Sequence, residues 1–136
     1  IAEAGVAHFG SLKKAMQLVD LAVAANADAV KFQIFRTEAL ISEEAGEWRQ
    51  RLGSRELPFS MFKEIRDYCN EKKIIFLATA HDEPSLKYLL ELNPSAFKVG
   101  SGEVANWGFV KTVAQQNKPK RSLLRCVYNW LSSLKN

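Results

Sequence analysis

The sequence lacks the features of disulfide-stapled, zinc-binding and membrane proteins. Its 136 residues include only two cysteines, Cys69 and Cys126, which lie far apart and form no C-x-x-C pair. We therefore expect reduced thiols in a cytosolic protein. No apolar run is long enough to cross a bilayer, and none has the shape of a signal peptide, so no membrane partner is expected.

Acidic residues are absent after Glu103. Six of the nineteen Lys and Arg residues lie beyond Glu103, but none of the fifteen Asp and Glu residues does. Residues 1–103 therefore carry a net charge of −2, and the overall net charge of +4 comes from the C-terminal end. A basic segment can contact nucleic acid. No nucleic-acid-binding motif accompanies this one, and we expect no nucleic-acid partner.

Histidine is also scarce. His8 and His81 are the only two, and both fall in turns that follow predicted strands. A metal site needs three or four ligands, so we predict a hydrogen-bonding or packing role for each histidine and no metal ligand. Neither is paired with Ser or Cys in the pattern of a hydrolase triad.

What the sequence does contain is a regular alternation of strand-like and helix-like segments. Periodicity predicts strands at 1–4, 29–35, 74–79 and 96–99, and helices at about 12–26, 58–72, 82–93 and 106–116. Such alternation is typical of a parallel sheet built from βαβ units. The polar connection 36–57 is unusually long, which predicts a lid or insert with a short helix around 43–51.

Two α/β architectures fit this pattern. One is a doubly wound sheet of four or five strands, and the other is the first half of an eight-fold β/α barrel. In the strand 29–35, Lys31 and Gln33 alternate with apolar residues. A central doubly wound strand is apolar on both faces, whereas a barrel strand can turn polar side chains inward. Lys31 and Gln33 therefore favour the barrel.

Polar side chains gather at the C-terminal ends of all four predicted strands, where ligands bind in either architecture. They are Glu3, Lys31, Gln33, Thr79, Lys98, Ser101 and Glu103. The run Lys98-Val99-Gly100-Ser101-Gly102-Glu103 is typical of a turn that cradles an anion. We interpret the lysines and hydroxyls as holding an anionic substrate and the two glutamates as contacting a hydroxylated one. The alternative is a set of interior Lys–Glu ion pairs that close the barrel. The agreement of four strands favours the binding site.

Four motifs at these strand ends resemble the N-acetylneuraminate (sialic acid) synthase family, which includes the legionaminate and pseudaminate synthases. The matching segments are Ile1-Ala2-Glu3-Ala4-Gly5 with His8 and Gly10-Ser11, Ala27-Asp28-Ala29-Val30-Lys31-Phe32-Gln33, Ile75-Phe76-Leu77-Ala78-Thr79, and Phe97-Lys98-Val99-Gly100-Ser101-Gly102-Glu103. The resemblance extends to about Pro119.

The resemblance implies a TIM-type (β/α)8 barrel of which about the first four units are present. It implies a transferase that condenses phosphoenolpyruvate with an N-acylated amino sugar such as N-acetylmannosamine, forming a sialic-acid-type nonulosonate and phosphate. It assigns Glu3 as the catalytic carboxylate, Lys31, Thr79, Lys98 and Ser101 to phosphoenolpyruvate, and Gln33 and Glu103 to the sugar. It also implies a divalent metal, Mn or Mg, with ligands outside this chain, and a homodimer for full-length members.

The chain departs from the family at several positions. Ala7 and Phe9 flank His8 where the family usually has Asn and often a polar residue, and Ala80-His81 replaces a common Pro-Phe. These changes border the sugar side of the expected site.

Residues 1–119 are predicted to form the N-terminal half of the barrel. Residues 120–136 are interpreted as a divergent basic tail that arose by a frameshift or a gene truncation, which translation of the coding DNA past Pro119 in the other frames would test. Both ends look cut, and we expect a fragment that is weakly active or inactive. The alternative function is a non-catalytic, doubly wound module that binds a phosphorylated small molecule.

Overall fold

The computed structural model describes residues 1–116, 118 and 120–122 of the 136-residue chain. Its strands are β1 (Ala2–Gly5), β2 (Ala29–Ile34), β3 (Ile75–Ala80), β4 (Phe97–Val99) and β5 (Lys120–Ser122). Its α-helices are α1 (Leu12–Ala24), α2 (Thr37–Leu40), α3 (Gly46–Gly53), α4 (Phe59–Glu71), α5 (Glu83–Leu92) and α6 (Trp107–Ala114), and a 3₁₀-helix, η1 (Ser101–Ala105), follows β4.

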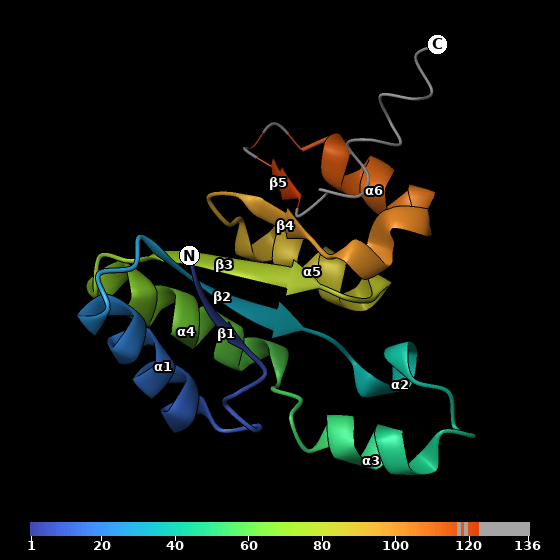
Figure 1. Ribbon diagram of the computed structural model, residues 1–136. Coiled ribbons are helices and arrows are strands. Elements are labelled where there is room, and N and C mark those ends of the chain that lie inside the picture. The colour runs from blue at the N-terminus through green and yellow to red at the C-terminus, as the bar shows by residue number, and fades with distance from the viewer. Residues whose placement is uncertain (117, 119, 123–136) are drawn as a thin grey trace.

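All strand pairs among the described residues are parallel. Strands β1, β2 and β3 form one hydrogen-bonded sheet in that order, with Glu3 opposite Lys31 and Gln33 opposite Thr79. Strand β4 lies beside β3, but its backbone ladder is formed with β5 (Figure 1). The predicted parallel α/β fold is confirmed, and the described strands form two hydrogen-bonded sheets that are divided between β3 and β4.

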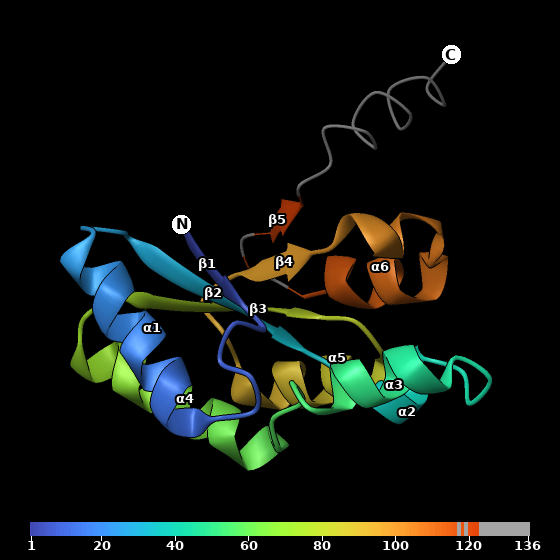
Figure 2. The same cartoon turned by 60° about the horizontal axis from the view of Figure 1, so that its bottom comes forward.

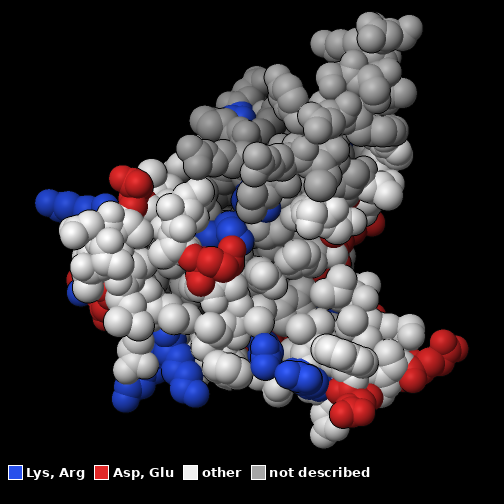
Figure 3. All heavy atoms as spheres, viewed as in Figure 1, with Lys and Arg blue, Asp and Glu red and all other residues white. Residues whose placement is uncertain are grey.

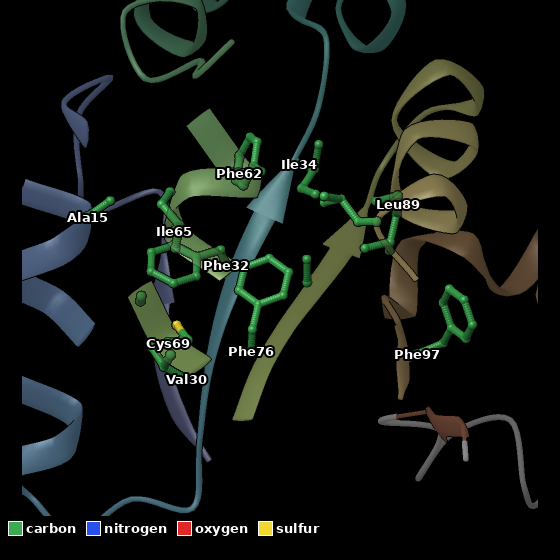
Figure 4. Close-up of a cluster of buried hydrophobic side chains, with 14 of the residues drawn as sticks. Ala15, Val30, Phe32, Ile34, Phe62, Ile65, Cys69, Phe76, Leu89 and Phe97 are labelled. Atoms are coloured by element: carbon green, nitrogen blue, oxygen red, sulfur yellow. The ribbon is translucent and has the colours of Figure 1, made fainter. Parts of the chain in front are cut away.

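Helices α1, α4 and α5 cover a single face of the β1–β2–β3 sheet, with α4 in contact with both neighbours (Figure 2). Phe32 and Phe76 stack beneath them with ring centroids 6.1 Å apart, and Ile65 of α4 and Leu89 of α5 complete the same core (Figure 4). A doubly wound sheet would have helices on both faces. Among the described residues, no helix covers the second face of these strands.

The helix ends follow the capping residues in the sequence. Ser11 accepts a hydrogen bond from the Lys14 N–H at the start of α1, and Asp82 accepts one from the Ser85 N–H at the start of α5. Asn93 ends α5 in the left-handed conformation, with a φ of 54°. These are standard N-cap and C-cap roles, which is why the sequence could predict them.

The long connection between β2 and α4 contains two short helices, of which the sequence predicted one. Helix α3 lies near the expected 43–51 segment, and α2 was not predicted. Glu56 fastens the connection to the end of β2, because its carboxylate accepts a hydrogen bond from the Thr37 N–H at 2.8 Å and pairs with Arg36 at 2.9 Å.

The predicted tail boundary falls close to β5. Residues 120–122 pair in parallel with β4, and residues 123–136 lie outside the described residues, as does Cys126. Cys69 is a free, buried thiol whose pKa burial raises to about 12. Within the described part of the chain, no helix combines the length and the apolar character that a bilayer crossing requires.

Candidate functional site

The face that the helices leave open carries an ion pair between adjacent strands. Glu3 on β1 and Lys31 on β2 are register partners, and their side chains form a salt bridge. The Lys31 side chain is only 8% exposed, whereas Glu3 is 55% exposed. In Figure 3 acidic and basic groups adjoin above these strands. This pair agrees with the ion-pair alternative for Lys31, and it also places a carboxylate and an ammonium group side by side at one end of the sheet.

Lys98 on β4 lies in the same region. It is buried, and its Nζ donates to the Val99 carbonyl at 2.8 Å. Burial lowers the pKa of Lys98, the positive charge of Lys31 lowers it further, and Glu3 opposes both effects. The positive charges of Lys31 and Lys98 lie close enough to repel each other, and Lys98 has no carboxylate partner among the described residues. Such a pair of ammonium groups is suited to binding an anion.

Thr79 on β3 lies between these lysine-bearing strands. It is buried, and its Oγ1 has no hydrogen-bond partner among the described residues. A Cβ built on Gly100, just after β4, would lie 3.4 Å from Thr79 Cγ2, so β3 and β4 approach closely here. A buried hydroxyl without a partner is uncommon in proteins and is a good candidate for a ligand contact.

Gln33, Glu103 and Ser101 complete the predicted set. A Cβ at Gly5 would lie 3.4 Å from Glu3 Oε1 and 3.7 Å from Gln33 Nε2, which places both polar groups against the end of β1. Glu103 is buried in η1 and accepts a hydrogen bond from Asn106 Nδ2 at 3.1 Å. Ser101 is exposed at the start of η1.

The two histidines have different positions. His8 is fully buried next to Phe32, with Nδ1 accepting from the Gly10 N–H at 3.2 Å, and burial lowers its pKa to about 4. His81 lies at the site; its pKa is lowered chiefly by burial, and the charges of Glu103, Lys31 and Lys98 also act on it. The sequence predicted a hydrogen-bonding or packing role for each histidine and no metal ligand, and it placed neither among the substrate-binding residues.

A metal site was tested on the same residues. The described part of the chain contains no group of three or more His, Cys, Asp or Glu side chains arranged to hold an ion. These residues therefore do not fit a metal centre. The divalent metal that the resemblance implies stays a prediction.

Comparison with known proteins identifies the family. The profile of the NeuB family matches residues 18–121. The chain belongs to the NeuB family. It is 40% identical over 129 residues to the spore coat polysaccharide biosynthesis protein SpsE of Bacillus subtilis, covering 88% of the chain and 35% of that protein. It is 34% identical over 131 residues to human N-acetylneuraminate-9-phosphate synthase, and the match covers 88% of this chain and 36% of the human protein.

Solved NeuB-type structures share the fold. The N-acetylneuraminic acid synthetase of Leptospira borgpetersenii, solved in complex with citrate, superposes with a TM-score of 0.86 at 27% identity, covering 98% of the chain and 48% of that structure. The SpsE structure superposes with a TM-score of 0.71 at 38% identity, and the match covers 89% of this chain and 34% of the SpsE chain. The chain spans about a third of the length of the curated NeuB relatives it matches. The resemblance inferred from the four motifs is thus confirmed.

Proposed function

We propose that this NeuB-family chain forms the phosphoenolpyruvate-binding half of a (β/α)8 barrel that condenses phosphoenolpyruvate with an N-acylated amino sugar. The products are a sialic-acid-type nonulosonate and phosphate. Support comes from relatives named for such products, including human N-acetylneuraminate-9-phosphate synthase and the N,N'-diacetyllegionaminic acid synthase of Campylobacter jejuni, which is 35% identical over 131 residues. The one-sided helix layer supports the half-barrel over the doubly wound binding module.

The observation that carries the proposal is the convergence of Lys31, Lys98 and Thr79 on the open face of the strands. Phosphoenolpyruvate bears a phosphate and a carboxylate, and two ammonium groups with a free hydroxyl match both. Burial, and after it the charge of Lys31, lowers the pKa of Lys98, and a bound anion would offset both effects. Ser101, at the start of η1, is proposed to supply a further hydroxyl.

The other polar groups are proposed to serve the sugar and the reacting carbons. Glu3 forms a salt bridge with Lys31 and is itself exposed to solvent. We therefore propose that its carboxylate contacts the reacting carbons next to the anion site. Gln33 shares the end of β1 with it. Glu103 offers a carboxylate oxygen to sugar hydroxyls beside its bond to Asn106. Fixed charges of this kind stabilise charge that develops during the reaction.

Features of the whole protein belong to the same proposal. We place the enzyme in the cytoplasm, with small molecules as its substrates, and expect full-length members to form homodimers. We also expect a divalent metal, Mn or Mg, in the full-length protein, with ligands supplied from outside this chain. Residues 120–136 are proposed as a divergent tail, and the chain by itself is expected to be weakly active or inactive.

Calorimetric titration with phosphoenolpyruvate tests the anion site. Lys98→Met should weaken binding at least about tenfold, because it removes a charge-assisted hydrogen bond in a buried setting. Lys87→Met, a matched change on the exposed side of α5, should leave the affinity within about twofold, since a solvated surface charge contributes little. Equal affinities for the wild type and both variants would contradict the assignment.

Phosphate release measures turnover directly. With phosphoenolpyruvate, N-acetylmannosamine and Mn²⁺, we expect the 136-residue chain to release phosphate at or near the background rate. Turnover well above background, dependent on both substrates, would contradict the expectation that the fragment cannot complete its site.

A further inference from the structure

His81 is the polar side chain at this site to which the proposed function gives no role. Its backbone N–H donates to the Ile34 carbonyl at 3.1 Å, so the pairing of β2 with β3 continues through this residue. Ala80 lies in the helix-covered core, and side chains alternate along a strand, so Thr79 and His81 share the open face. A Cβ at Gly100 would lie 3.4 Å from Thr79 Cγ2 and 3.5 Å from His81 Cε1. The two side chains are therefore neighbours, with His81 one step nearer the C-terminal end.

The surroundings of His81 keep its imidazole uncharged near neutral pH. Burial lowers its pKa most, while Glu103 and Asp82 raise it and Lys31 and Lys98 lower it. A neutral imidazole has one N–H donor and one acceptor nitrogen. Its Nε2 is buried and has no hydrogen-bond partner among the described residues.

We infer that His81 is a specificity-determining residue that hydrogen-bonds, through Nε2, to a hydroxyl or amide group of the acceptor sugar. The inference rests on the proposed function and adds a contact to its sugar side. Among charged groups, Glu103 has the largest effect on the pKa of His81. Glu103 is also the carboxylate that we propose for the sugar. Thr79, one step deeper, is the group proposed for the anion.

The chemistry of the two substrates favours the sugar. An N-acylated amino sugar presents uncharged donors and acceptors, which suit a neutral imidazole. Phosphoenolpyruvate presents negative charge, which Lys31 and Lys98 already match. A side chain without a hydrogen-bonding group could not make this contact. His81 therefore favours an acceptor that presents a matching hydroxyl or amide group.

Nuclear magnetic resonance of the imidazole groups tests the inference without any activity. The chain has two histidines, so ¹³C/¹⁵N-histidine labelling gives two ring spin systems, which His81→Phe assigns. We expect N-acetylmannosamine, added in the presence of phosphoenolpyruvate and Mg²⁺, to shift the His81 ring nitrogens. His8 is fully buried, so its ring signals should shift less than those of His81.

Matched variants measure the size of the effect. His81→Phe keeps a planar ring and should weaken sugar binding about fivefold, the effect of one uncharged hydrogen bond. The affinity for phosphoenolpyruvate should stay within about twofold, and His81→Gln, which keeps a donor and an acceptor, should restore most of the sugar affinity. Thermal unfolding of each variant verifies folding; a merely structural His81 would instead show a lowered midpoint in His81→Phe and unchanged sugar affinity.

The possible outcomes separate this inference from the proposed function. Phosphoenolpyruvate binding that depends on Lys98 would support the anion site. If, in addition, the sugar does not shift the His81 ring signals and His81→Phe binds the sugar as tightly as the wild type, the inference about His81 is wrong and the anion site stands. A His81 shift produced by phosphoenolpyruvate alone would likewise overturn the assignment to the sugar. If neither substrate binds, both the inference and the proposed function fail.

Discussion

Thr79 is a buried residue that could either bind the ligand or stabilise the fold, and the two roles predict opposite effects of a substitution on affinity and stability. Its Oγ1 lacks a partner among the described residues, so the isosteric Thr79→Val should leave the free energy of unfolding unchanged or slightly higher. The same change should weaken phosphoenolpyruvate binding about fivefold, because the ligand loses a hydroxyl donor. Urea unfolding and calorimetry measure the two quantities. A clear loss of stability with unchanged affinity would identify Thr79 as a structural residue.

His8 makes folding sensitive to mild acid. Burial lowers its folded-state pKa from 6.5 to about 4, so the unfolded chain binds the proton first as pH falls. The stability that neutral His8 contributes is therefore present above pH 6.5 and is lost progressively from pH 6.5 to 4. Each pH unit in this window costs at most about 1.4 kcal/mol.

The variant His8→Asn tests this pH dependence. Its Oδ1 can still accept from the Gly10 N–H, but it does not titrate. Thermal midpoints of His8→Asn should fall less between pH 6.5 and 4 than those of the wild type. His81, whose pKa is also lowered, contributes a residual slope in both proteins. Identical slopes in the two proteins would refute the prediction.

At the scale of elements, Asp82 fastens the end of β2 to the start of α5. One carboxylate oxygen accepts from the Arg36 N–H at 2.7 Å and the other from the Ser85 N–H at 2.7 Å. Asp82→Ala should lower the free energy of unfolding by about 2 kcal/mol, since a cap is lost and a part-buried N–H is left unpaired. Ser11→Ala removes a longer, exposed cap bond of 3.4 Å and should cost less, below about 1 kcal/mol. Chemical denaturation that ranks Ser11→Ala as the more damaging change would contradict this.

The elements also show which features of a sequence predict structure. Capped, periodic segments such as α1 and α5 were predictable because Ser11 and Asp82 mark their starts and their apolar spacing is helical. Helix α2 was not, because it is four residues long and has no side-chain cap. The separate ladder of β4 with β5 was not predictable either, since a three-residue strand carries no signal of which neighbour it pairs with.

The candidate site was predicted unevenly for a similar reason. Lys31 and Gln33 alternate with apolar residues on a strand, and that pattern alone places them on the face opposite the core. The position of His81 depends on the close approach of Gly100 to β3, a tertiary contact with no local signal.

At the scale of the whole molecule, one face of the sheet is covered by helices and the other carries the charged and polar groups. The fold matches the NeuB-family structures, of which the chain covers about half or less. Four strand ends contribute to the open face, and no single element contains the site. A ligand that uses it must therefore contact residues from β1 to η1 together.

Backbone amide shifts on addition of phosphoenolpyruvate test that claim most directly. The central prediction is a single cluster of shifted amides at the C-terminal strand ends, including Gly5, Thr79, His81 and Gly100, with the cluster lost in Lys98→Met. A contradictory result would be shifts centred on the groove between α5 and α6, lined by Leu86, Leu90 and Phe109, with the strand ends unchanged.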